Sequence, residues 1–201
     1  MMWLCQTPLM RRQQAAYDEI MSSVGTEHGG LFFVDGPDGT GKTYLYKALL
    51  ATIRSQKKIA MATTTSGVAT SIMPGGRTAH SRFKIPLTID NGAFCTFTKQ
   101  SELPFEGKTV VFGGDFRQVL PVIRRGSRAQ IVSASLQMSY LWDSMRHLKL
   151  VCNMRAKSDQ WFAEYLLRIG GGSEEATIDD QICLPHDVCV PHTGKIVTLI
   201  L

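Results

Sequence analysis

The stretch Gly36-Pro37-Asp38-Gly39-Thr40-Gly41-Lys42-Thr43 decides the fold of this chain. The short apolar run LFFV at residues 31–34 precedes it and is typical of a buried parallel strand. After it, Leu45, Leu49 and Ile53 recur every four residues, which predicts a helix. Strand, glycine-rich turn and helix in this order form the context in which the pattern G-x-x-x-x-G-K-[ST] is a phosphate-binding loop.

Each fixed position of the loop has a chemical reason. Glycines allow the backbone to approach phosphates closely, and the N–H groups of the loop and the helix N-terminus then face the anion. Lys42 supplies a positive charge to the terminal phosphates, and Thr43 supplies a hydroxyl to Mg²⁺. Asp38 places a carboxylate in this loop, so we expect it to weaken nucleotide binding. The predicted ligands are therefore ATP and Mg²⁺, held by all eight loop residues, Gly36 to Thr43.

Further elements follow outward from the loop. We predict helices at 13–24, at 67–73 and from a cap at Asp159 to a stop at Gly170, and strands at 58–63 and 108–112. Strands that alternate with helices predict an α/β fold with a mostly parallel sheet and helices on both faces. We expect an N-terminal segment at 1–30, a P-loop domain at 31–170 and a weakly structured tail at 171–201.

Composition narrows the class of protein. The 201 residues carry a formal charge of +5 and a sequence pI of about 9.0, which favours a polyanionic partner without requiring one. The five cysteines are scattered and include no CxxC pair, as expected of reduced intracellular thiols. The sequence shows neither a signal peptide nor an apolar segment long enough to span a bilayer, so we expect an intracellular protein without a membrane partner.

Several blocks surround the P-loop in a fixed order. They are TSGVA at 65–69, TAHSRF at 78–83, GDFRQVLP at 114–121 and LVCNMR at 150–155. Together with the P-loop, these blocks resemble the superfamily 1B DNA helicases of the petite-integration-frequency (Pif) type, especially the branch carried by Helitron transposons. The resemblance runs from about Leu9 to Glu175.

The resemblance implies an incomplete RecA-like P-loop fold and roles for individual residues. Gln13 corresponds to the adenine-reading glutamine of the family, Gln118 to the γ-phosphate sensor and Arg155 to a nucleotide-facing arginine, so the implied catalytic residues are Lys42, Gln118 and Arg155. The implied contacts with single-stranded DNA are Thr65, Ser66, Thr78, His80, Ser81, Arg82 and Phe83. Each has a plain structural alternative: a turn cap for Gln118, a surface ion pair for Arg155, a helix cap for Thr65 and Ser66.

Two departures from the family pattern matter. The Walker B strand, an apolar run ending in an Asp-Glu pair, is missing, because Lys99-Gln100-Ser101-Glu102 runs directly into Leu103. The second motor lobe of the family is also absent from these 201 residues. The resemblance places the Walker B strand between 58–63 and 108–112. We therefore expect these two segments to pair directly, and the chain to be poorly stable or to aggregate.

The resemblance implies an ATP-dependent 5′–3′ DNA helicase, acting on single strands or junctions in repair, recombination and telomere maintenance in the nucleus, and impaired by the missing strand. A non-enzymatic, transposon-derived remnant that binds nucleotide or DNA is the main alternative, and another P-loop phosphotransferase, such as a nucleotide kinase, is the second. Cys183, His186, Cys189 and His192 recur at a spacing of three, but two intervening prolines favour an extended chain that spreads them apart, which disfavours zinc. The basic cluster at 124–128 fits either phosphate contacts or a solvated surface.

Overall fold

The computed structural model describes residues 8–85, 104–116, 121–123, 125–154, 159–175 and 182. The chain divides into two compact units, Met1–Ser158 and Asp159–Leu201. The domain boundaries predicted at 30/31 and 170/171 stay a prediction. No helix in the described part of the chain is long and apolar enough to cross a membrane.

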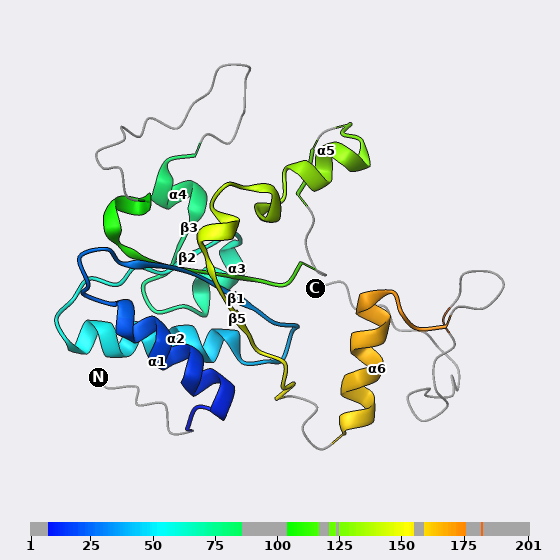
Figure 1. Ribbon diagram of the computed structural model, residues 1–201, viewed down its shortest axis with the longest axis horizontal. Coiled ribbons are helices and arrows are strands. Elements are labelled where there is room, and N and C mark those ends of the chain that lie inside the picture. The colour runs from blue at the N-terminus through cyan, green and yellow to red at the C-terminus, as the bar shows by residue number, and fades with distance from the viewer. Residues whose placement is uncertain are drawn as a thin grey trace, which may run out of the picture. The chain divides into compact units, whose positions relative to one another are not determined.

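A three-stranded parallel sheet forms the centre of the first unit (Figure 1). β1 (Gly30–Asp35) lies in the middle, between β4 (Thr109–Gly114) and β5 (Arg146–Lys149). The register pairs Asp35 with both Gly114 and Lys149, so the carboxyl ends of all three strands meet at one edge. The predicted α/β class with a mostly parallel sheet is confirmed.

The core consists of two clusters, one on each face of the sheet. Alternate side chains of β1 point to opposite faces, because the side-chain period of a strand is two. Phe32 and Val34 pack against α1 (Arg11–Ser23) and α2 (Lys42–Ser55), which lie side by side on one face. Leu31 and Phe33 pack on the other face against residues of the turns η2 (Leu136–Met138) and η3 (Trp142–Ser144). Both predicted helices that flank the P-loop are therefore confirmed.

A second, two-stranded parallel sheet pairs β2 (Thr63–Thr64) with β3 (Arg77–Thr78). Two five-residue helices accompany it, α3 (Gly67–Ser71) and α4 (Ala79–Phe83). Ser66 Oγ accepts a hydrogen bond from Ala69 N at 3.1 Å, and Thr78 Oγ1 accepts one from Ser81 N at 3.3 Å. Each hydroxyl therefore caps the first turn of its helix, where backbone N–H groups lack partners.

The predicted pairing of residues 58–63 with 108–112 is wrong. β4 pairs with β1 over six residues, and only the last residue of the predicted second strand, Thr63, lies in a strand at all. The physical reason is that other groups bind the carbonyls of this segment: Arg54 donates to Ala60 O, and Ala62 O accepts from Arg82 and from the amide of Arg77 in β3 rather than from β4.

Two short elements complete the described part of the first unit. They are the turn η1 (Pro104–Gly107) and the helix α5 (Arg128–Ser133), whose N-cap Ser127 belongs to the basic cluster.

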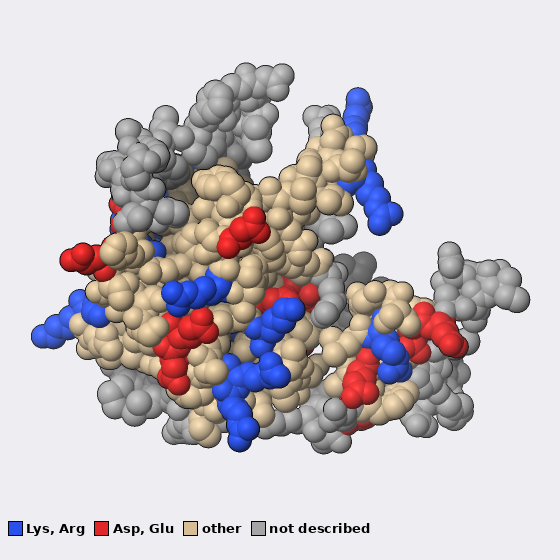
Figure 2. All heavy atoms as spheres, in the orientation of Figure 1, with Lys and Arg blue, Asp and Glu red and all other residues tan. Residues whose placement is uncertain are grey.

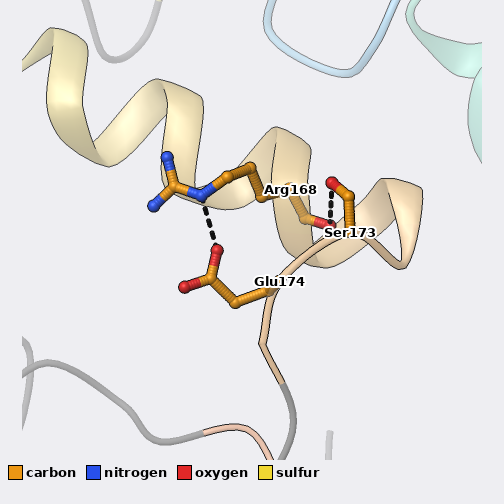
Figure 3. A network of polar contacts seen from close by, with 3 residues as sticks. All are labelled: Arg168, Ser173 and Glu174. Carbon is orange, nitrogen blue, oxygen red and sulfur yellow. Dashed lines mark hydrogen bonds and ion pairs between the residues drawn. The ribbon is translucent and has the colours of Figure 1, made fainter.

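The second unit contains α6 (Gln160–Gly171), which Asp159 caps as predicted by accepting from Phe162 N at 2.8 Å. α6 ends one residue after the predicted stop. Figure 3 shows this end, where Arg168 pairs with Glu174 at 2.5 Å and its carbonyl accepts from Ser173 Oγ at 3.3 Å. The four Cys and His residues considered for zinc lie outside the described residues.

Candidate nucleotide and DNA site

The loop between β1 and α2 has the backbone that a phosphate cradle needs. Gly39 and Gly41 adopt φ values of +80° and +79°, the left-handed region that favours glycine. A Cβ on Gly41 would lie 2.3 Å from Gln13 Nε2, and one on Gly36 would lie 2.7 Å from the Leu150 carbonyl oxygen. These glycines are therefore required by close approach, and α2 begins directly after Gly41 with its N-terminus at the loop.

Lys42 is half-buried at the first position of α2. Its Nζ donates to the carbonyl oxygens of Gly36 and of Pro37, the latter at 3.0 Å. Burial lowers the pKa of Lys42, while Asp115, Asp38 and Asp35 act in the opposite direction through their negative charges. The ammonium group is thus held over the loop, where the terminal phosphates of a nucleotide would meet it.

A hollow of about 390 Å³ opens over the loop. This volume falls in the range of ligand pockets, about 300–1,000 Å³. Backbone and side chains of the P-loop line it together with α2 and one residue from after β5; the lining residues are Asp38, Gly39, Thr40, Gly41, Lys42, Thr43, Tyr44, Lys47 and Met154. Thr43 is exposed beside Lys42, as its predicted role toward Mg²⁺ requires.

The chain that follows β5 crosses the P-loop. Leu150 N donates to Asp35 O at 2.8 Å, and Met154 N donates to Gly39 O at 2.7 Å. A Cβ on Gly39 would lie 2.5 Å from Asn153 Oδ1, so this segment fits closely against the loop. The predicted block at 150–155 therefore reaches the nucleotide site, although Arg155 itself lies outside the described residues.

Gln13 connects α1 to the same site. The side chain is 3% exposed; its Nε2 donates to Thr40 O and to Met154 Sδ, both at 3.0 Å, and its Oε1 accepts from Met10 N at 3.0 Å. Gln13 thus holds the P-loop in place, and a small hollow of about 10 Å³ lies beside it. Contact with adenine requires the free lone pair of Oε1 or an exchange of partners, so adenine reading stays a prediction.

The end of β4 brings one more block to the site. Gly114 pairs with Asp35, the last residue before the P-loop, and Asp115 follows at once. Asp115 exerts the strongest of the three carboxylate effects on the pKa of Lys42. Gln118, the predicted phosphate sensor, lies outside the described residues, and its role stays a prediction.

The predicted DNA contacts lie on or directly beside the short elements β2, α3, β3 and α4 of the first unit. Thr65, His80, Ser81 and Phe83 are exposed, whereas the hydroxyls of Ser66 and Thr78 cap helices. Arg82 turns inward and donates from Nη2 to Ala62 O at 3.1 Å. On the face drawn in Figure 2, basic and acidic side chains are interspersed rather than gathered in one patch.

A model of the PIF1-like helicase family matches residues 8–103 and 97–180. The chain belongs to the PIF1-like helicase family. The two matched ranges overlap at 97–103, the segment where the Walker B strand is predicted to be missing. No curated protein matches the chain significantly in sequence.

Solved structures of Pif1 helicases share the fold of this PIF1-like chain. The Candida albicans Pif1 helicase aligns with a TM-score of 0.65 and 20% identity, over 82% of this chain and 44% of that one. Bacteroides Pif1 in complex with ADP-AlF3 and single-stranded DNA aligns with a TM-score of 0.63 and 19% identity, over 87% and 48%. The PIF1-like chain thus spans about half the length of the structures it matches.

Sequence reasoning missed several parts of the nucleotide site in this PIF1-like protein. β5 has the sequence Arg-His-Leu-Lys, which offers neither an apolar run nor turn signals, so periodicity does not find it. Tyr44, Lys47 and Met154 line the hollow, and only Met154 lay in a predicted block. Lys47 lies four residues after Thr43 on α2, so the two residues share a helix face, and this spacing was the one available signal.

Proposed function

We propose that this chain is the nucleotide-binding lobe of an ATP-dependent 5′–3′ DNA helicase, with impaired hydrolysis. One observation carries the proposal: the P-loop hollow of about 390 Å³ is formed by Lys42 and its neighbours together with Met154, which follows β5. In this hollow a nucleotide meets loop N–H groups, an ammonium group and a helix N-terminus at once, which is the arrangement that binds phosphates.

The residues of the hollow divide the work of binding. Lys42 neutralises charge on the terminal phosphates, and the Thr43 hydroxyl faces the metal that accompanies them. When bound, Mg²⁺ supplies charge neutralisation of the phosphate oxygens. Within the described residues no group of three or more acidic, His or Cys side chains is placed to hold a metal alone. Mg²⁺ usually binds through one or two side chains together with the phosphates of the nucleotide, and Thr43 would be such a side chain here.

We propose Gln118 and Arg155 as the groups that face the γ-phosphate. Each follows a segment that ends at the nucleotide site, β4 with Asp115 for the first and the chain after β5 for the second. A neutral amide orients the attacking water, and a guanidinium stabilises charge on the transferred phosphoryl group. We propose Gln13 as the adenine reader, which a comparison of ATP and GTP affinities tests.

Single-stranded DNA or a DNA junction is the proposed partner. Exposed Thr65, His80 and Phe83 offer hydroxyl, imidazole and aromatic groups suited to backbone contacts and base stacking. Basic side chains that neutralise DNA phosphates release counterions on binding, so affinity should fall steeply with salt. We further propose nuclear DNA repair, recombination or telomere maintenance as the setting.

Impaired hydrolysis follows from the missing Walker B acids. A general base typically contributes about 10²–10⁴-fold to a rate, and the sequence has no Asp-Glu pair at the end of an apolar run to supply it. The second candidate, a remnant that binds ligands without turnover, is favoured by this same absence. Asp115 lies near Lys42 but belongs to the block that carries Gln118.

ATP hydrolysis with and without single-stranded DNA separates the candidates. The helicase lobe gives slow hydrolysis that DNA stimulates, and Lys42→Met removes both hydrolysis and nucleotide binding. The control Lys57→Met, at an exposed position two residues after the end of α2, leaves them intact. Nucleotide binding without turnover supports the remnant. Phosphate transfer to a nucleoside monophosphate supports a kinase and rejects the helicase.

A further inference from the structure

Guanidinium groups donate hydrogen bonds to the backbone of the segment that leads into β2. Arg54 donates to the Ala60 carbonyl oxygen from Nε at 3.1 Å and from Nη2 at 2.9 Å. Two residues on, the Ala62 oxygen accepts from Arg82 Nη2 at 3.1 Å and from Arg77 N at 3.2 Å. In the part of the chain that the structure describes, no strand pairs with the Ala60 carbonyl, so Arg54 satisfies it, whereas the Ala62 carbonyl is shared between Arg82 and the first residue of β3.

Arg54 also forms a hydrogen bond with the chain after α3. Its Nη1 donates to the Pro74 carbonyl oxygen at 2.9 Å, after α3 has ended. A Cβ on the neighbouring Gly75 would lie 3.5 Å from Arg54 Nη2, so the chain approaches the guanidinium closely at this turn. One side chain thus binds both chain ends of residues 60–74, and the planar fork of arginine donors suits two carbonyls at once.

The location of Arg54 gives these bonds a meaning. It lies in the last turn of α2, whose first residue is Lys42. The segment between its two carbonyl partners carries β2, α3 and the predicted DNA contacts Thr65 and Ser66. The helix α2 therefore has the P-loop at its N-terminal end, and near its C-terminal end Arg54 forms hydrogen bonds with the segment that carries the predicted DNA contacts.

We propose that Arg54 is a positioning residue that fixes residues 60–74 on the P-loop helix and thereby sets the affinity for single-stranded DNA and its response to nucleotide. The proposal rests on the proposed function for its DNA part. Arg54 contacts neither the nucleotide hollow nor the predicted DNA contacts, so its effect passes through the two carbonyls.

The first test uses hydrogen–deuterium exchange of the whole chain to measure how strongly Arg54 stabilises residues 60–74. Arg54→Lys keeps the positive charge, but the single lysine nitrogen cannot bind both the Ala60 and the Pro74 carbonyl as the guanidinium does. Amides in 60–76 should therefore exchange faster, while amides in 42–50 keep their protection. Lys57→Gln, an exposed cation three residues on, should leave both regions unchanged. Unchanged exchange of 60–76 in Arg54→Lys would overturn the proposal, whatever the chain binds.

The second test measures a fluorescent oligo-dT and a fluorescent ADP on the same variants. We expect Arg54→Lys to weaken oligo-dT binding about tenfold, the effect of losing a charge-assisted hydrogen bond, and to reduce its change on adding nucleotide. ADP affinity should stay within twofold. Equal losses for oligo-dT and ADP indicate a general stability role and reject positioning. Absence of oligo-dT binding by the unaltered chain rejects the proposed DNA function and the DNA part of this inference, and exchange still decides the hold itself.

Discussion

A Cβ atom on Gly113 would lie 1.7 Å from the Tyr46 hydroxyl oxygen. Tyr46 belongs to α2 and Gly113 to β4, so this contact fixes how closely the P-loop helix lies on the strand that leads to Asp115. The Tyr46 hydroxyl is buried and has no hydrogen-bond partner within the described part of the chain.

Gly113→Ala should destabilise the chain by about 1–3 kcal/mol, the usual cost of overpacking. The new methyl group overlaps Tyr46 Oη, and either α2 or β4 must shift. Denaturant titration followed by circular dichroism measures the loss. Adding Tyr46→Phe to the variant removes the overlapping oxygen and should restore part of the stability, whereas simple additivity of the two changes would contradict the contact.

Tyr46→Phe alone should raise stability at neutral pH by about 1 kcal/mol, because an unsatisfied buried hydroxyl costs about 1–3 kcal/mol. Burial also raises the pKa of Tyr46 far above its ordinary value of 10.0. The folded state therefore keeps the phenol proton where the unfolded state loses it, and stability falls as pH rises above 10. Urea midpoints at pH 8 and above pH 10 should show a smaller alkaline loss in the phenylalanine variant than in the unaltered chain.

Asp38→Gly should tighten ATP binding several-fold at fixed Mg²⁺. Asp38 lines the hollow and is one of the three carboxylates that act on Lys42, so its charge opposes that of the phosphates. Asp38→Asn, which removes the charge but keeps the shape, should give the same gain. Calorimetric titration decides: a gain with Gly alone would trace the effect to backbone freedom, and no gain with either would reject the charge argument.

Ser66→Ala and Thr65→Val should separate structure from DNA binding. Ser66 caps α3, so its loss should cost about 0.5–2 kcal/mol of stability. Thr65 is exposed, and its substitution should leave the denaturation midpoint unchanged while weakening oligo-dT binding. The reverse pattern, with stability lost at Thr65 only, would contradict both assignments.

The sequence predicts those parts of the fold that depend on local signals. The apolar run of β1, the glycines of the loop and the four-residue spacing in α2 act within a few residues of one another. The strand predicted at 31–34 therefore matches β1 within one residue at each end, and the helix predicted after the loop is α2. β5 was not found, because it is a strand only by its pairing with β1 and by Leu150 N bonding to Asp35 O. Strand propensity depends on such neighbours more than helix propensity does.

The wrong pairing has the same origin. Residues 58–62 look like a strand in isolation, but two side chains from outside the segment, Arg54 and Arg82, bind their carbonyls. Gln13 illustrates the opposite case: its place beside the P-loop was predicted, while its bonds to Met10, Thr40 and Met154 depend on three separate segments. The family resemblance therefore suggests which residue lies at the site, and tertiary contacts decide what it does.

Charging the exposed apolar residues before β2 should reduce aggregation. Ile59 and Met61 are 90% and 64% exposed and lie two residues apart in the segment before β2, which belongs to no strand, while the adjacent Ala62 is buried. Exposed apolar side chains next to a strand favour association between chains, and lysine at such positions opposes it by repulsion and by its hydration. Ile59→Lys with Met61→Lys should lower the light scattering of the concentrated protein and leave the circular dichroism spectrum unchanged.

The matched control is Val122→Lys, since Val122 is 95% exposed but far from this segment in sequence. This substitution adds a positive charge without removing Ile59 and Met61. An equal decrease in scattering with Val122→Lys would assign the effect to net charge, and continued aggregation of the double variant would show that residues 59 and 61 do not drive association.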